Sequence, residues 1–258
     1  MKYFLFEKKD RIGILTINRP RALNALHRAS LEELLRFLDT EIGRENICVL
    51  ILTGAGGKAF IAGADIKEMN QLSPVQMLEF LDLGQRITVL LERPDLISIA
   101  AVNGYALGGG LEIALACDLI YASTTAKLGL PEVTLGIIPG FGGTRRLSRA
   151  IGNRGAKEMI FSGQAISADE AKEVGLVNKV VAPKQLLPEA VKMAEKIVRN
   201  SLFAVFEAKR TIQGGANMAL LEALELEKQA CALSFATEDR RERMDAFRQK
   251  RIPQFKVR

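Results

Sequence analysis

Residues 103–112 read Asn-Gly-Tyr-Ala-Leu-Gly-Gly-Gly-Leu-Glu, and a Pro-Glu pair follows at residues 131–132. Three consecutive glycines, Gly108 to Gly110, leave backbone N–H groups bare of side chains. The apolar residues after them predict a helix, so these groups lie where a helix begins and can point at a developing negative charge. Glu112 falls on the first turn of this helix, and Glu132 lies on a predicted loop. Bare amides and two acids are groups that chemistry at a carbonyl requires.

The segments on either side alternate between predicted strands and helices. Apolar runs predict strands at 12–18, 48–53, 97–102 and 119–122, and helices are predicted at 30–41, 74–93 and 109–116, the first with Ser30 and Glu33 as a capping box. This alternation favours an α/β core with a mainly parallel sheet. In such a core the catalytic loops lie beyond the carboxyl ends of strands, where the glycine-rich turn is expected.

Helices dominate the second half of the chain. They are predicted at 143–150, 154–161, 167–174, 184–199, 202–212, 217–235 and 238–249, with one short strand signal at 176–181. The part from residue 196 onward differs from the α/β core, so we expect two domains, residues 1–195 and 196–258. The helix at 217–235 carries an apolar stripe that must be buried on its own core or on another subunit.

The composition of the 258 residues argues against several classes of protein. With His27 as the single histidine, a Ser-His-Asp or Cys-His device would need that residue, and a zinc site usually needs more His or Cys. The three cysteines, Cys48, Cys117 and Cys231, lack metal-binding or CxxC spacing, which favours a reducing compartment. No apolar run approaches the roughly 20 residues of a membrane span, and the N-terminus does not have the pattern of a signal peptide. We therefore expect a cytoplasmic protein without a membrane segment.

The net charge of +6 favours an anionic partner, such as a phosphorylated cofactor, nucleic acid or a membrane surface. Glu112 is the other unusual charge, because it lies in an otherwise apolar helix. Burying an ionised, unpaired acid costs several kcal/mol, so this residue must have a partner, a raised pKa or a chemical role. Each segment taken alone also has a structural explanation: the glycines as close packing, and Glu132 as a solvated acid at a helix start.

Residues 99–119 closely resemble the signature of the enoyl-CoA hydratase/isomerase (crotonase) superfamily. Other blocks match the family in its order, at 18–26, 60–67, 131–140, 162–177 and 247–250, so that the resemblance covers essentially the whole chain. It implies the crotonase fold, an α/β spiral of ββα units with a C-terminal helical trimerisation region. Residues 1–195 would then form the core with the acyl-CoA site, and residues 196–258 the oligomerisation region.

The resemblance also implies an active site. Family members stabilise the enolate oxygen of an acyl-CoA thioester with two backbone amides, which here would belong to Ala64 and Gly109. In the hydratases of the family, two glutamates hold the attacking water and transfer its protons. The matching residues are Glu112, assigned as the base, and Glu132, assigned as the acid. Gly140 matches the residue whose amide contacts that water.

Coenzyme A is part of the substrate in this family, and the resemblance implies neither a metal nor another cofactor. The positions that match its CoA contacts are Arg21, Ala22, Leu23, Ala62, Asp65, Ile66, Lys67, Phe247 and Lys250. The last two lie in the basic tail, residues 240–258, which in the family reaches the CoA of a neighbouring subunit. A homotrimer or a homohexamer, a dimer of trimers, is therefore implied.

The presence of both glutamates favours the reversible syn hydration of a 2-trans-enoyl-CoA to a 3-hydroxyacyl-CoA, in fatty acid β-oxidation or related acyl-CoA catabolism. Enoyl-CoA isomerisation is an alternative, although isomerases of the family tend to lose the acid at the position of Glu112. A second alternative is RNA binding on the same fold. The chain has no RNP-like aromatic motif and no dense Arg/Lys run before its tail, which argues against it. Ile61 stands where many hydratases have a small residue, which leaves the shape of the acyl pocket open.

Overall fold

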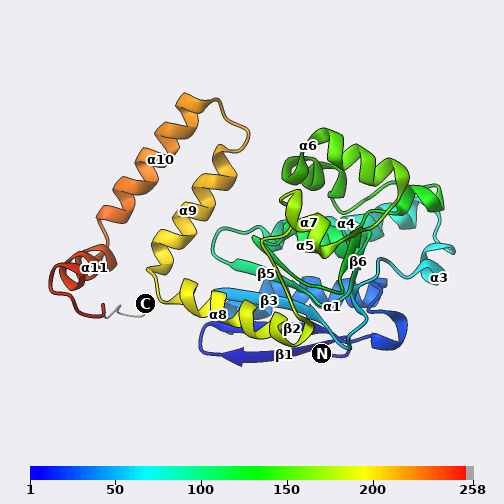
Figure 1. Ribbon diagram of the computed structural model, residues 1–258, viewed down its shortest axis with the longest axis horizontal. Helices are drawn as coiled ribbons and strands as arrows, with labels where there is room; N and C mark the ends of the chain where they lie inside the picture. The colour runs from blue at the N-terminus through cyan, green and yellow to red at the C-terminus, as the bar shows by residue number, and fades with distance from the viewer. Residues whose placement is uncertain (254–258) are drawn as a thin grey trace. The chain divides into compact units, whose positions relative to one another are not determined.

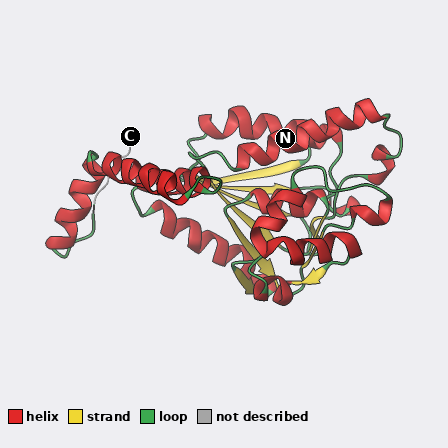
Figure 2. Ribbon diagram, turned by 90° about the horizontal axis from the view of Figure 1, so that it is seen from above, coloured by secondary structure: helices red, strands yellow, loops and turns green. Residues whose placement is uncertain are grey.

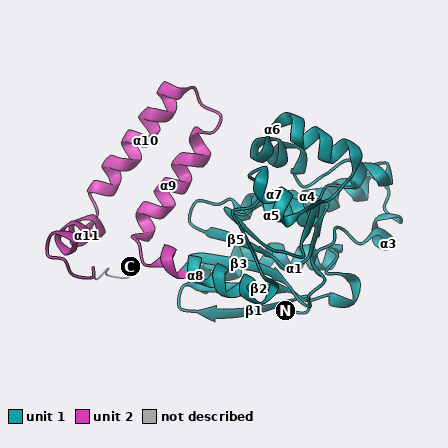
Figure 3. Cartoon of the chain, in the orientation of Figure 1, with its two compact units in different colours: residues 1–194 teal, residues 195–258 magenta. Residues whose placement is uncertain are grey.

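A computed structural model describes residues 1–253 and contains two compact units, Met1–Ala194 and Glu195–Arg258 (Figures 1 and 3). The last five residues of the basic tail, 254–258, lie outside the described residues. The first unit holds both sheets and most helices, and the second consists of helices in its described part. Within residues 1–253, none of the helices has the length and apolar character needed to cross a membrane.

The larger sheet of the first unit has six strands in the order β1-β2-β3-β5-β7-β10. Their bounds are Phe4–Lys9, Ile12–Ile17, Val49–Gly54, Ile97–Val102, Leu119–Ser123 and Lys179–Val181. β1 and β2 pair antiparallel, and every other neighbouring pair is parallel. All residues of β3 and β5 are buried, as expected for strands covered on both faces. Figure 2 shows helices on both sides of these strands. The prediction of a mainly parallel sheet is confirmed.

A second sheet is built from short strands that the sequence pattern did not indicate. Its order is β4-β6-β8-β9, with bounds Ala59–Ile61, Tyr105–Leu107, Lys127–Gly129 and Ile166–Ser167. β4, β6 and β8 each follow a strand of the larger sheet and precede a helix. The chain therefore repeats a ββα unit, as the expected spiral fold requires.

The helices of the first unit cover the sheets and frame the site. They are α1 (Arg28–Arg36), α2 (Ile42–Arg44), α3 (Ile66–Met69), α4 (Pro74–Leu91), α5 (Gly109–Ala116), α6 (Gly143–Ser162) and α7 (Ala168–Glu173), with α8 (Leu186–Val198) running into the second unit. A π-helical turn follows α1 at Phe37–Glu41, and 3₁₀ turns lie at Pro20–Ala22, Glu132–Leu135 and Pro183–Gln185. α4 begins at Pro74 with Ser73 as its cap, as Pro at the first helical position predicts. α6 joins the two predicted helices, with a break at Gly152, whose φ is 76°.

The prediction of Ser30 as the cap of the first helix was wrong. α1 begins three residues earlier, with His27 as its cap, and the His27 side chain accepts a hydrogen bond from the N–H of Ser30. Ser30 completes this capping box by accepting from the N–H of His27 at 3.0 Å. Glu33 instead accepts the N–H groups of Lys2 and Tyr3, both at 2.9 Å. The acid thus ties the start of the chain to α1.

The second unit contains α9 (Leu202–Gly215), α10 (Leu220–Phe235) and α11 (Glu238–Arg248). α9 and α10 lie side by side and run in opposite directions (Figure 1). Within the described residues, the apolar stripe of α10 is largely exposed, with Leu221 80% and Leu224 47% exposed.

Candidate active site

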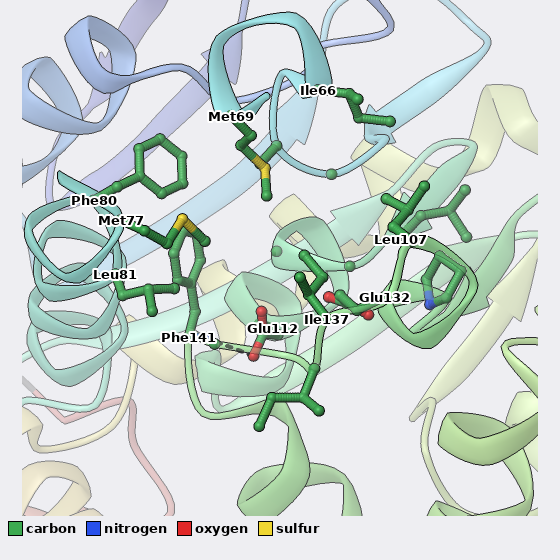
Figure 4. A pocket seen from close by; sticks show the side chains of 18 of the residues that line it. Ile66, Met69, Met77, Phe80, Leu81, Leu107, Glu112, Glu132, Ile137 and Phe141 are labelled. Atoms are coloured by element: carbon green, nitrogen blue, oxygen red, sulfur yellow. Dashed lines mark hydrogen bonds between the residues drawn. The ribbon is translucent and has the colours of Figure 1, made fainter. Parts of the chain in front are cut away.

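A pocket of about 290 Å³ lies in the first unit, at the glycine-rich turn. Its walls come from the segment 62–69, from α4, from the start of α5 and from the segment 131–141, and most of its side chains are apolar (Figure 4). Among the lining residues, Glu112 and Glu132 are the only ionisable ones, and both carboxyl groups point into the pocket (Figure 4). Segments far apart in the sequence thus place two acids in one apolar cavity.

Two backbone N–H groups that line this pocket are available as donors. The residues on either side of Ala64 pair with Leu26: the N–H of Leu26 donates to the Gly63 carbonyl at 2.8 Å, and the N–H of Asp65 donates to the Leu26 carbonyl at 2.7 Å. Gly109 is the first residue of α5, where helical N–H groups lack an internal partner. Within residues 1–253, neither the Ala64 N–H nor the Gly109 N–H makes a hydrogen bond. The structure therefore brings two unused donors to the pocket.

Gly108 has to be a glycine because of its conformation and its neighbours. Its φ is 51°, and a Cβ there would lie 2.9 Å from Oε1 of Glu132. Gly110 packs against the backbone of Ile61, where a Cβ would collide with the carbonyl oxygen. Ile61 itself is fully buried and does not line the pocket.

Glu112 is 2% exposed, yet its carboxylate has partners. Its Oε1 accepts the N–H of Phe141 at 2.7 Å and the N–H of Gly143 at 2.6 Å. Burial raises the pKa of Glu112, while the amides of Gly143, Phe141 and Gly140 and the charge of Arg146 lower it. The sequence left three explanations for a buried acid at Glu112: a partner, a raised pKa or a chemical role. The structure shows two of them, hydrogen-bond partners and a raised pKa.

Glu132 has different surroundings. It opens a 3₁₀ turn, Glu132–Leu135, so the prediction of a loop at this position was wrong. Its Oε2 is buried and has no hydrogen-bond partner within residues 1–253. Burial, and to a smaller extent the negative charge of Glu112, raise the pKa of Glu132 to about 7. Burial thus raises the pKa of both acids, but backbone amides oppose this shift at Glu112, whereas one carboxyl oxygen of Glu132 has no such donor within residues 1–253.

Gly140 lines the pocket and its amide faces Glu112. Its carbonyl accepts the side-chain N–H of Gln85 at 2.9 Å. The sequence did not single out the amides of Phe141 and Gly143 or the side chain of Arg146, although all three act on Glu112. No pattern could have marked the two amides, since every residue except proline offers one.

The positions that match CoA contacts are distributed over several places. Ala62 and Ile66 line the pocket, whereas Asp65 caps α3 and forms an ion pair with Arg19 at 3.2 Å. Lys67 is exposed on α3.

Arg21 and Leu23 line a second pocket of about 330 Å³ in the first unit, which also includes Lys58, a basic residue that the sequence reading missed. Ala22 ends the adjoining 3₁₀ turn. Phe247, which is 84% exposed, and Lys250 belong to the second unit. Within the first unit, the contact positions thus fall on two pockets and on the exposed surface of α3.

A repeated ββα unit around such a pocket defines the crotonase fold. Residues 7–258 match the family model described as enoyl-CoA hydratase/isomerase. The chain is 46% identical over 247 residues to the short-chain-enoyl-CoA hydratase of Clostridium acetobutylicum, covering 96% of this chain and 95% of that protein. It is 44% identical to the crotonyl-CoA hydratase of Syntrophomonas wolfei, covering 97% and 96% of the two chains.

Among solved structures, the enoyl-CoA hydratase from Bacillus anthracis superimposes with a TM-score of 0.94 at 45% identity, covering 98% of this chain and 99% of that one. The chain therefore belongs to the enoyl-CoA hydratase/isomerase family, and the predicted crotonase fold is confirmed.

Proposed function

We propose that this protein is an enoyl-CoA hydratase, a hydro-lyase that catalyses the reversible syn addition of water to a 2-trans-enoyl-CoA, giving a 3-hydroxyacyl-CoA. The observation that carries the proposal is the contrast between two acids in one apolar pocket. Glu112 accepts two backbone hydrogen bonds, whereas a buried oxygen of Glu132 has no partner within residues 1–253. The printed names of the relatives, short-chain-enoyl-CoA hydratase and crotonyl-CoA hydratase, support the same reaction.

The unused N–H groups of Ala64 and Gly109 would bind the thioester oxygen of the substrate. When water attacks Cβ, negative charge moves to that oxygen, and two fixed donors stabilise it more strongly than they stabilise the substrate. The donor of Gly109 also lies at the start of α5, where the helix dipole favours negative charge. This arrangement polarises the conjugated double bond for attack.

The two acids divide the proton transfers. Ionised Glu112 takes a proton from the attacking water, and protonated Glu132 delivers one to Cα, so that the elements of water add and the total number of protons is conserved. The pKa of about 7 of Glu132 suits an acid that must give up its proton near neutral pH. The amide of Gly140, which faces Glu112, would contact the same water. In dehydration the two roles reverse.

The apolar side chains of the pocket would surround the acyl group, and they come mainly from α4 and the segment 131–141. A short acyl chain such as crotonyl fits both the pocket volume of about 290 Å³ and the names of the relatives. The CoA portion would lie against the segments 21–23 and 62–67, and the chain's net charge of +6 favours binding of its phosphates. Fatty acid β-oxidation or related acyl-CoA catabolism is the corresponding role.

We also propose that the chain forms a homotrimer or a dimer of trimers through its second unit. The exposed apolar side chains of α10, with Leu220 72% and Leu221 80% exposed, need a partner surface. Phe247 and Lys250 would then reach the CoA of a neighbouring subunit. Cys48, Cys117 and Cys231 form no disulfide within residues 1–253, as a reducing cytoplasm would require.

A substrate panel tests the reaction. The protein is incubated with 2-trans-enoyl-CoA esters of short, medium and long chain, and the loss of the conjugated double bond is followed together with formation of the 3-hydroxyacyl-CoA. We expect fastest turnover with the short ester. A 3-enoyl-CoA is tested in parallel. Isomerisation of that ester without hydration of any 2-trans-enoyl-CoA would contradict the proposal.

A further inference from the structure

The carboxylate of Glu112 is held by a short loop that has no regular structure of its own. Residues 139–142 precede α6, and the N–H groups of Phe141 and Gly143 donate to Oε1 of Glu112 at 2.7 and 2.6 Å. Gly142 between them has a φ of 101°, in the region that favours glycine. A backbone with this freedom needs external contacts if its two donors are to keep their direction.

Those contacts act on the carbonyl groups of the same loop. Each peptide plane carries one carbonyl and the N–H of the next residue, so fixing a carbonyl also fixes the neighbouring donor. Gln85 of α4 donates to the Gly140 carbonyl at 2.9 Å, which orients the N–H of Phe141. The Phe141 carbonyl lies in the plane between the two donors, and it accepts from Arg146 Nη1 at 2.9 Å and from Thr88 Oγ1 at 3.2 Å.

Arg146 is itself fixed by an acid at the end of α4. Its Nε and Nη2 bind the two carboxylate oxygens of Glu92 at 2.8 and 2.6 Å, the bidentate geometry that a guanidinium allows. The Arg146 side chain is only 15% exposed, so solvent competes little for these bonds. A Cβ at position 142 would meet Nη1 of Arg146, so the guanidinium lies directly against the backbone of Gly142. α4 thus reaches the loop through Glu92 and Arg146 as well as directly.

We propose that Arg146 and Glu92 form a positioning pair for the hydration reaction, which holds the Phe141 carbonyl so that the amides of Phe141 and Gly143 keep Glu112 in place as the base. This inference rests on the proposed function. The charged groups that face Glu112 are Arg146 from α6 and Glu132 from the 3₁₀ turn, and Glu92 reaches it only through Arg146. Loss of Arg146 removes a positive charge and loosens the loop, and both effects disfavour the ionised base.

The chain offers a closely matched control. Arg93 also binds a carboxylate through both Nε and Nη2, that of Asp95 at 2.6 and 2.8 Å, and it also donates to a backbone carbonyl, that of Leu38 at 3.2 Å. Neither Arg93 nor Asp95 lines the pocket. Arg93→Gln therefore removes the same kind of contact without touching the loop of Glu112.

The test compares Arg146→Gln, Arg146→Lys and Arg93→Gln with the wild type. For Arg146→Gln we expect kcat for crotonyl-CoA hydration to fall about tenfold or more, because misplaced catalytic groups carry such costs. We expect KM to stay close to its wild-type value. In the pH profile of kcat, the acid limb should move to higher pH, because the base Glu112 is protonated more readily. Arg146→Lys keeps the positive charge but loses the bidentate contact with a carboxylate. It should therefore restore the position of the acid limb more fully than it restores the value of kcat. Arg93→Gln should change thermal stability only.

A second readout does not depend on turnover. The titration of the Glu112 carboxyl is followed by ¹³C NMR, with the signal assigned by its loss in Glu112→Gln. A higher pKa of Glu112 in Arg146→Gln supports the positioning pair even if the wild type hydrates no enoyl-CoA, a result that would overturn the proposed function alone. An unchanged titration and pH profile in Arg146→Gln, or equal losses of kcat in Arg146→Gln and Arg93→Gln, would overturn the positioning pair.

Discussion

Replacing Glu132 with Gln should stabilise the folded protein at alkaline pH while it impairs catalysis. The pKa of Glu132 is raised from 4.5 to about 7, mainly by burial, so the pocket disfavours the ionised side chain. Since one pKa unit corresponds to about 1.36 kcal/mol, ionisation of Glu132 in the folded state costs about 3 kcal/mol. Gln has nearly the same shape and carries no charge, and therefore avoids this cost.

The sign of the pH dependence follows from proton binding. Between about pH 4.5 and 7 the unfolded chain has lost the proton of Glu132 and the folded chain retains it, so the free energy of unfolding decreases as pH rises. Below this range both states are protonated, and above it both are ionised. For a single group with these two pKa values, the decrease between pH 5 and 8 is about 2.5 kcal/mol. Glu132→Gln should lack this contribution.

The assay is urea unfolding of the wild type and of Glu132→Gln at pH 5 and pH 8, at one protein concentration because association affects apparent stability. Glu170→Gln is the control of opposite sign. Hydrogen bonds from Ser167 lower the pKa of Glu170, so neutralising it should not stabilise the protein at pH 8. If Glu132→Gln and the wild type differ in stability by the same amount at both pH values, the assignment of a protonated Glu132 near neutral pH is refuted.

Three further predictions concern the donors, the base and assembly. Gly109→Pro removes the proposed donor at a helix position that tolerates proline, and should lower kcat about 100-fold or more, whereas Gly109→Ala keeps the N–H and serves as its control. In Gly143→Ala the new Cβ would lie 2.9 Å from Oε1 of Glu112, so steady-state assays should detect a drop in kcat that Gly43→Ala, in open space, does not cause. Leu221→Glu places a charge on an 80% exposed apolar residue, and sedimentation should reveal a smaller species; an unchanged mass would argue against association through α10.

The features that could be predicted from the sequence are those with a local physical cause. Continuous apolar runs mark buried parallel strands, and β5 lies at the predicted residues 97–102. The glycine-rich turn and the helix Gly109–Ala116 also lie where they were predicted. Three glycines followed by an apolar stretch favour a turn that leads into a buried helix. The burial of Glu112 could also be predicted, because the residues around it in this helix are apolar.

The features that could not be predicted depend on contacts between distant segments. The strands β4, β6 and β8 have three residues each, too few for a recognisable alternation. Arg146 and Glu92 are far apart in sequence, and neither stands in an unusual local pattern. The capping box that the sequence suggested for Ser30 and Glu33 does not form, and Glu33 instead accepts N–H groups from the start of the chain, a contact between segments about 30 residues apart.

The participation of both Glu112 and Glu132 in proton transfer is the central claim, and one measurement tests it most directly. Crotonyl-CoA hydration is measured for Glu112→Gln and Glu132→Gln, and the binding of a saturated acyl-CoA is measured for the same variants. Because proton transfer by a positioned group contributes about 100-fold or more, each substitution should lower kcat by at least that factor while the Kd of the saturated ester stays close to that of the wild type. Turnover near the wild-type value in either variant would contradict the account.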